Sequence, residues 1–117
     1  MSFVTKCVDE ACSLVLNRVE ELGLDVQDGC QDDEWFYWEW VDEACNLYET
    51  HVVFGKNDDG SNTFGIRCGY TEPKGEQFDW TFPASIDGLS VGSVARMVTD
   101  CLANTVQQHI ERGVDGV

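Results

Sequence analysis

The chain has 117 residues, of which 22 are aspartate or glutamate and 7 are lysine or arginine, so its net charge is −15. This length predicts one domain, residues 1–117, and a hydrophobic fraction of 43% is typical of a folded protein rather than a disordered one. The charge disfavours direct binding to nucleic acid or to an anionic membrane, because both are negative, and it favours a basic partner.

The first predicted element is a helix over residues 5–22. Its apolar residues fall on one stripe at helical spacing: Val8, Ala11, Val15, Val19 and Leu22. Ser2 or Thr5 can cap the start, and Gly23 is expected to end the helix. Residues 24–32 are predicted to form a loop.

Residues 31–49, QDDEWFYWEWVDEACNLYE, combine three of the four tryptophans with many carboxylates. Dense aromatic residues favour a strand. At 100° per residue, however, the acidic residues fall on about half of a helix and the apolar residues on the other half. We therefore predict a helix over residues 34–49, with Asp32 or Asp33 as its N-cap. If a strand forms instead, residues 35–41 should pair with the next segment.

The following residues have the alternation of β-structure. Strands are expected at residues 49–55, 62–70 and 77–82, with an Asp-Gly hairpin turn at 57–60 and a turn at 72–76. Pro83 should close the last strand. A final helix is expected over residues 90–112, with Ser90 at its cap and Gly113 beyond its end.

The predicted fold class is α+β in the order α-α-β-β-β-α. It has a three-stranded antiparallel meander, or four strands if residues 35–41 join it, packed against two or three helices.

Residue patterns do not favour a catalytic, metal or cofactor site, and we expect a protein that is not an enzyme. The glycine-containing acidic loops lack the terminal carboxylates of an EF-hand, and His51 and His109 lie on different elements. A solvated loop is favoured over an irregular cation site at Asp25, Asp28, Asp32 and Asp33. The six cysteines are scattered and are expected to be buried, reduced thiols in a cytoplasmic protein.

The carboxylates themselves are the main candidate for function. On the predicted helix they recur about every 5–9 Å of rise, a pitch that can imitate the phosphates of a DNA strand. Trp35 could anchor a partner, whereas Phe36 and Trp40 should be buried. The predicted partner-binding residues are Asp25, Asp28, Asp32, Asp33, Glu34, Trp35, Glu39, Asp42, Glu43 and Glu49.

In size and charge the chain resembles phage anti-defence proteins such as anti-CRISPR proteins and restriction inhibitors. The resemblance implies a non-catalytic inhibitor in the host cytoplasm that presents a DNA-like surface to a basic nucleic-acid-binding protein. Reversing the charges of Glu39, Asp42 and Glu43 together is then expected to weaken binding and leave the fold intact.

Three other interpretations stay open. One is an acidic assembly chaperone or adaptor that binds a protein through apolar surface and forms monomers or homodimers. Another is a cation-binding protein whose melting temperature rises with calcium. The last is a surface adapted to high salt, although six cysteines and four tryptophans are not typical of that adaptation.

Overall fold

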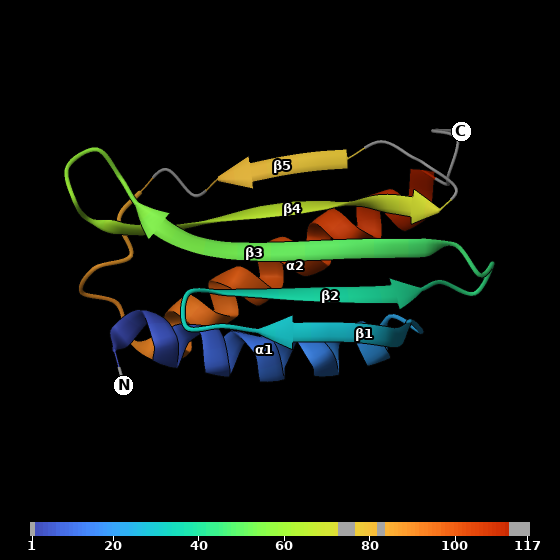
Figure 1. Ribbon diagram of the computed structural model, residues 1–117, viewed down its shortest axis with the longest axis horizontal. Coiled ribbons are helices and arrows are strands. Elements are labelled where there is room, and N and C mark those ends of the chain that lie inside the picture. Colours follow the sequence, from blue (N-terminus) through green and yellow to red (C-terminus); the bar gives the residue numbers. More distant parts are fainter. Residues whose placement is uncertain (1, 73–76, 82–83, 113–117) are drawn as a thin grey trace.

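The computed structural model describes residues 2–72, 77–81 and 84–112, and Figure 1 shows their arrangement. The elements in chain order are α1 (Phe3–Glu21), β1 (Asp25–Gln31), β2 (Trp35–Val41), β3 (Leu47–Lys56), β4 (Asn62–Glu72), β5 (Gln77–Thr81) and α2 (Val91–Arg112). The five strands form one sheet in the order β1-β2-β3-β4-β5, and all neighbours are antiparallel. The α+β class is confirmed.

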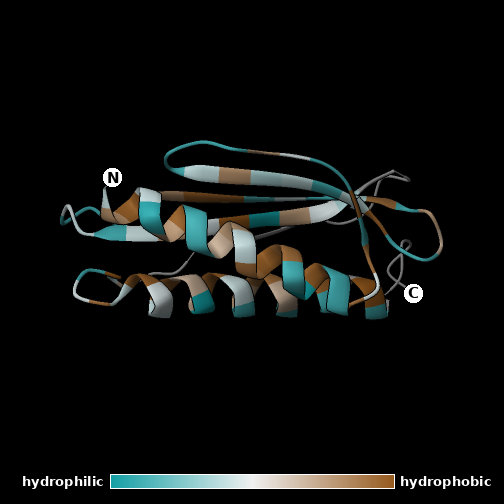
Figure 2. Cartoon of the chain, turned by 90° about the horizontal axis from the view of Figure 1, so that it is seen from below, coloured by the Kyte–Doolittle hydropathy of each residue, from teal (hydrophilic) through white to brown (hydrophobic). Residues whose placement is uncertain are grey.

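The molecule has two layers. Figure 2 shows the sheet on one side and both helices on the other. Helix α1 packs against α2 and contacts β1 and β2, whereas α2 contacts β4. The opposite face of the sheet carries no helix among the described residues.

Both predicted terminal helices are confirmed to within two residues at each end. Ser2 caps α1 by accepting a hydrogen bond from the backbone N–H of Thr5 at 3.1 Å, and Gly23 follows the helix with a φ of 79°. The Ser90 hydroxyl accepts from the backbone N–H of Ser93 at 3.1 Å and caps α2 in the same way.

The core lies between the helices and the inner face of the sheet. The Trp40 indole is fully buried and stacks on Tyr48 with 4.1 Å between ring centroids. The prediction that Phe36 and Trp40 are buried is confirmed, since both are 0% exposed. Each buried aromatic ring of this kind contributes several kcal/mol to stability, on the order of 3–5 when truncated to alanine.

The predicted helix over residues 34–49 is wrong. Residues 35–41 form β2, which pairs with β3 from Trp35↔Val53 to Val41↔Leu47, as the strand alternative required. The strand places Phe36, Trp38 and Trp40 on the inner face and leaves the Trp35 side of the strand open. The β-propensity of four consecutive aromatic residues therefore outweighs the helical sorting of charge.

The predicted loop over residues 24–32 is also wrong, because residues 25–31 form the edge strand β1. An edge strand needs little apolar alternation, and β1 has a register shift between Val26 and Asp28. Its inward-facing Gln31 side chain donates a hydrogen bond to Asp9 of α1. The sheet consequently has five strands rather than three or four.

The three strands predicted after residue 48 are confirmed as β3, β4 and β5, and Gly60 in the hairpin turn has a φ of 86°. Residue 82, Pro83 and residues 73–76 of the last predicted turn lie outside the described residues. Across the described residues, neither helix is apolar enough over a sufficient length to pass through a bilayer.

Candidate interaction surface

The open face of the sheet is built by alternate residues of adjacent strands. Strand register aligns Asp28, Glu39 and Glu49 in one row across β1, β2 and β3. The next row places Cys30 and Tyr37 beside His51. Neighbouring strands lie about 4.8 Å apart, and residues on one face of a strand advance about 6.8 Å.

The structure places all ten predicted partner-binding residues on one half of the sheet, although not on a helical stripe. Each lies on β1, on β2, at the start of β3 or in the turns between them: Asp25, Asp28, Asp32, Asp33, Glu34, Trp35, Glu39, Asp42, Glu43 and Glu49. Glu34 and Asp42 stand at opposite ends of β2, eight residues and so roughly 27 Å apart. The carboxylates form an elongated strip rather than a compact cluster, and at its far end Asp42 and Glu43 line a pocket beside Leu22 and Gly23 at the end of α1.

This strip has no positive charge in its own sequence. Residues 25–49 contain nine acidic residues and no lysine or arginine. The side chains are solvent-exposed at both β1 positions, in the β1–β2 turn and at Glu43, and they are half-buried at Glu39, Asp42 and Glu49. We name the β1–β2 hairpin with the start of β3, residues 25–49, the acidic hairpin surface.

Tyr37 joins two carboxylates at the centre of this surface. Its hydroxyl lies 2.7 Å from Oε1 of Glu39 and 2.9 Å from Oε2 of Glu49, whose Cα atoms are register partners. Burial and then the two carboxylates raise the pKa of Tyr37 far above its ordinary value, so the hydroxyl keeps its proton. A phenol has one proton to donate, so the hydroxyl donates to one of the two glutamates at a time.

A shallow apolar pocket of about 390 Å³ lies beside this cluster. Its lining comes from three strands: Cys30, Trp35, Tyr37, His51 and Val53. The His51 imidazole stands at 86° to the ring of Trp35, 5.6 Å away, and at 86° to the ring of Tyr37, 6.0 Å away. Burial, followed by the charge of Arg67, lowers the pKa of His51 against the opposing effect of Glu49, so the imidazole is neutral at pH 7.

Of the five residues that line this pocket, only Trp35 was predicted to bind a partner. The others were missed because the helix prediction separated the Trp35–Val41 segment from the following strand. The sequence did contain a signal for this pocket, because every second residue of a strand lies on the same face. Once the two segments pair, one face carries Trp35, Tyr37 and Glu39 beside Val53, His51 and Glu49.

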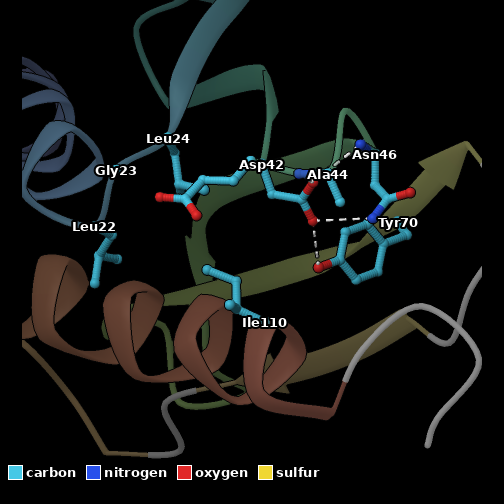
Figure 3. Close-up of a pocket in the computed structure, with 9 residues that line it drawn as sticks. Leu22, Gly23, Leu24, Asp42, Ala44, Asn46, Tyr70 and Ile110 are labelled. Carbon is cyan, nitrogen blue, oxygen red and sulfur yellow. Dashed lines mark hydrogen bonds between the residues drawn. The ribbon is translucent and has the colours of Figure 1, made fainter.

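Asp42 has a structural role at the far end of β2. One carboxylate oxygen of Asp42 accepts hydrogen bonds from the backbone N–H groups of Ala44 and Asn46, both at 3.0 Å. The other accepts the Asn46 side-chain amide at 3.1 Å and the Tyr70 hydroxyl at 3.0 Å, as Figure 3 shows. These bonds hold the β2–β3 turn, in which Cys45 has a φ of 66° that non-glycine residues rarely adopt.

The Asp42 carboxylate lines a pocket of about 410 Å³ between this turn and the ends of both helices, with Leu22 and Ile110 on its opposite side. Partial burial alone would raise the pKa of Asp42, but the hydrogen bonds from Asn46, Tyr70 and Ala44 outweigh it and lower the pKa. Asp42 is therefore ionised and fully engaged within the fold.

We expect the substitution Asp42→Asn to lower the free energy of unfolding by about 2–3 kcal/mol at pH 7, because an amide nitrogen cannot accept two of the four hydrogen bonds. Since the folded-state pKa of Asp42 is lowered, its stabilisation is present above the ordinary carboxyl pKa and is lost as the pH falls through the folded-state value. Urea unfolding at pH 7 and pH 3 measures both effects.

Asp58→Asn, in the exposed β3–β4 turn, is the matched control and should have little effect at either pH. An equal loss in the two variants would contradict the role of Asp42. Charge reversal of Asp42 together with Glu39 and Glu43 is consequently unsuitable for testing the surface, because it also disrupts the turn.

The six cysteines are all free, and the prediction that they are buried holds only in part. Cys7, Cys12 and Cys68 are buried, and burial raises the pKa of Cys7 and of Cys12 to about 11. Cys30 and Cys45 are exposed, because β1 and the β2–β3 turn lie at the surface.

Within residues 2–72, 77–81 and 84–112, no three histidine, cysteine or acidic side chains gather in a way that could hold a metal ion. The four aspartates from Asp25 to Asp33 lie along a strand and a turn rather than around one point. Comparison with known proteins gives no matching family model, no matching curated protein and no matching solved structure.

Proposed function

We propose that this protein is a non-catalytic inhibitor whose acidic hairpin surface occupies the nucleic-acid-binding groove of a basic protein, in the manner of phage anti-defence proteins. The observation that carries the proposal is the uninterrupted negative charge of one half of the sheet. Residues 25–49, which form β1, β2, the turns beside them and the start of β3, contain nine acidic residues and no lysine or arginine.

The spacing of a β-sheet suits this role. Neighbouring strands lie about 4.8 Å apart, a repeat of the same order as the phosphate step of about 3.4 Å along a DNA strand. Rows such as Asp28, Glu39 and Glu49 repeat the charge across strands. Hydrogen-bonded strands hold these carboxylates in place, so a partner need not order a flexible acidic chain when it binds.

A protein adaptor that binds through apolar surface is the second candidate. The observation in its favour is the pocket beside Trp35 and His51, where Val53 is 42% exposed. The two functions differ in their response to salt, because salt screens charge pairs between exposed groups but leaves apolar contacts nearly unchanged.

The experiment is a capture of basic proteins from a lysate by the immobilised protein, followed by elution with either salt or a DNA duplex. We expect the captured partner to bind DNA itself, to be displaced by the duplex, and to lose affinity at least tenfold between about 50 and 200 mM salt. A partner that stays bound in both eluents would contradict DNA mimicry and support the adaptor.

A further inference from the structure

We infer that the pocket lined by Cys30, Trp35, Tyr37, His51 and Val53 receives an arginine side chain of the protein partner. This inference rests on the proposed function for the basic character of the partner. It names the contact that fixes the position of the partner on the charged surface. The pocket lies on the open sheet face, in the row next to Glu39 and Glu49.

The aromatic walls suit a planar cation. Trp35 and Tyr37 each stand nearly perpendicular to His51, so the pocket presents ring faces and edges from three side chains. Guanidinium groups stack on such faces, most strongly on tryptophan. The neutral imidazole of His51 adds no positive charge to repel the guest.

The carboxylate pair supplies the complementary charge. Glu39 and Glu49 are register partners, and like charges in that arrangement repel each other. Neither forms an ion pair with a described lysine or arginine. The single proton of Tyr37 can serve one of the two oxygens at a time, whereas a guanidinium offers five N–H donors in a planar fork.

The dimensions of the surface match the length of an arginine side chain. The carboxylates lie one same-face step, about 6.8 Å, from the pocket row. The aliphatic stem of an arginine can therefore cover Val53 and Trp35 while its guanidinium reaches Tyr37 and the glutamates. Lysine carries a compact ammonium that cannot engage both carboxylates and a ring face together, so arginine is the favoured guest.

The one described positive charge close to this row is Arg67, the register partner of His51 on β4. It does not line the pocket. Its other register partner is Asp79 on β5, so Arg67 lies one strand from the pocket, between His51 and a residue of opposite charge in the register.

The test is a titration of the protein with three capped tripeptides, Gly-Arg-Gly, Gly-Lys-Gly and Gly-norleucine-Gly, followed by ¹H–¹⁵N correlation spectra. We expect saturable shifts of the Trp35 indole N–H and of the Tyr37, His51 and Val53 amides, with the arginine peptide binding about tenfold more tightly than the norleucine peptide. Lysine should fall between them. The substitution Trp35→Ser should abolish the saturable shifts.

A matched pair of variants separates pocket binding from attraction to net charge. Val53→Lys places a cation at the pocket, whereas Leu89→Lys adds the same charge at a residue of similar exposure, 40% against 42%, in the segment before α2. We expect Val53→Lys to weaken arginine binding at least tenfold and Leu89→Lys to change it less than twofold.

Equal weakening by the two lysine variants, or equal shifts with norleucine, would overturn the arginine pocket and leave the acidic hairpin surface as the sole basis of binding. A different result would contradict the proposed function and leave the arginine pocket in place. In that result the arginine peptide binds the pocket, but DNA does not displace a captured partner.

Discussion

Removing four exposed carboxylates from the acidic hairpin surface is expected to lower affinity for the captured partner by roughly 100-fold at low salt. The variant carries Asp25→Asn, Asp28→Asn, Asp33→Asn and Glu34→Gln, all at exposed positions of β1 and the β1–β2 turn. At about 0.5–1 kcal/mol for each charge at an interface rim, the loss amounts to about 3 kcal/mol.

The same variant should also show a shallower dependence of affinity on salt, because fewer charge pairs form in the complex. Calorimetric titrations with the captured partner at about 50 and 200 mM salt measure both quantities. The fold should be retained, since within the described part of the chain none of the four side chains forms a hydrogen bond to another element.

The control variant removes the same number of charges from the helical layer through Glu10→Gln, Glu20→Gln, Asp100→Asn and Glu111→Gln, which are exposed on α1 and α2. Its affinity should fall only a few-fold, since these residues contribute to the overall field and not to the contact. Equal losses in the two variants would show that net charge alone drives binding.

Gly29→Ala is expected to destabilise the protein by about 1–3 kcal/mol, the usual cost of forcing extra volume into a packed site. Gly29 faces Trp38 across the β1–β2 pair, and a Cβ atom there would lie 2.1 Å from Cε3 of the indole. Trp38 is itself packed against the core, so the ring has to move away from its buried neighbours. Urea unfolding monitored by near-UV circular dichroism measures the loss.

Gly55→Ala, in β3, is the matched control, because a Cβ atom at Gly55 meets no atom within 4 Å. It should be neutral or stabilising by up to about 1 kcal/mol, since alanine restricts the unfolded chain. Gly29→Ala should lower the free energy of unfolding by less in a Trp38→Val variant than in the original chain, because the smaller side chain leaves room for the methyl group. A loss at Gly29 no larger than that at Gly55 would contradict this packing.

Sequence patterns predict the helices, the last three strands and the α+β class, because each of these elements has a local signal. The stripe from Val8 to Val19 and the alternation in residues 62–70 require no knowledge of a partner element. The local signal is ambiguous for the segment from Trp35 to Val41. Its charges sort as a helix and its rings prefer a strand, and pairing with both β1 and β3 determines the outcome.

The acidic strip was identified from sequence with the wrong geometry, and the aromatic pocket was largely missed. Tyr37, His51 and Val53 come together only through the register of β2 with β3. The role of Asp42 was equally inaccessible, because its partner Tyr70 is 28 residues away and the turn it holds depends on a left-handed Cys45.

The position of β1 at the sheet edge has a consequence for the behaviour of many copies of this protein together. A strand with a neighbour on one side leaves backbone groups on the other side that invite a further strand, and repeated addition produces fibrils. The negative side chains of β1 and its register shift near Val26 oppose such growth. The charge proposed here to attract a basic partner thus also keeps identical molecules apart, and an acidic or very salty solution weakens that protection.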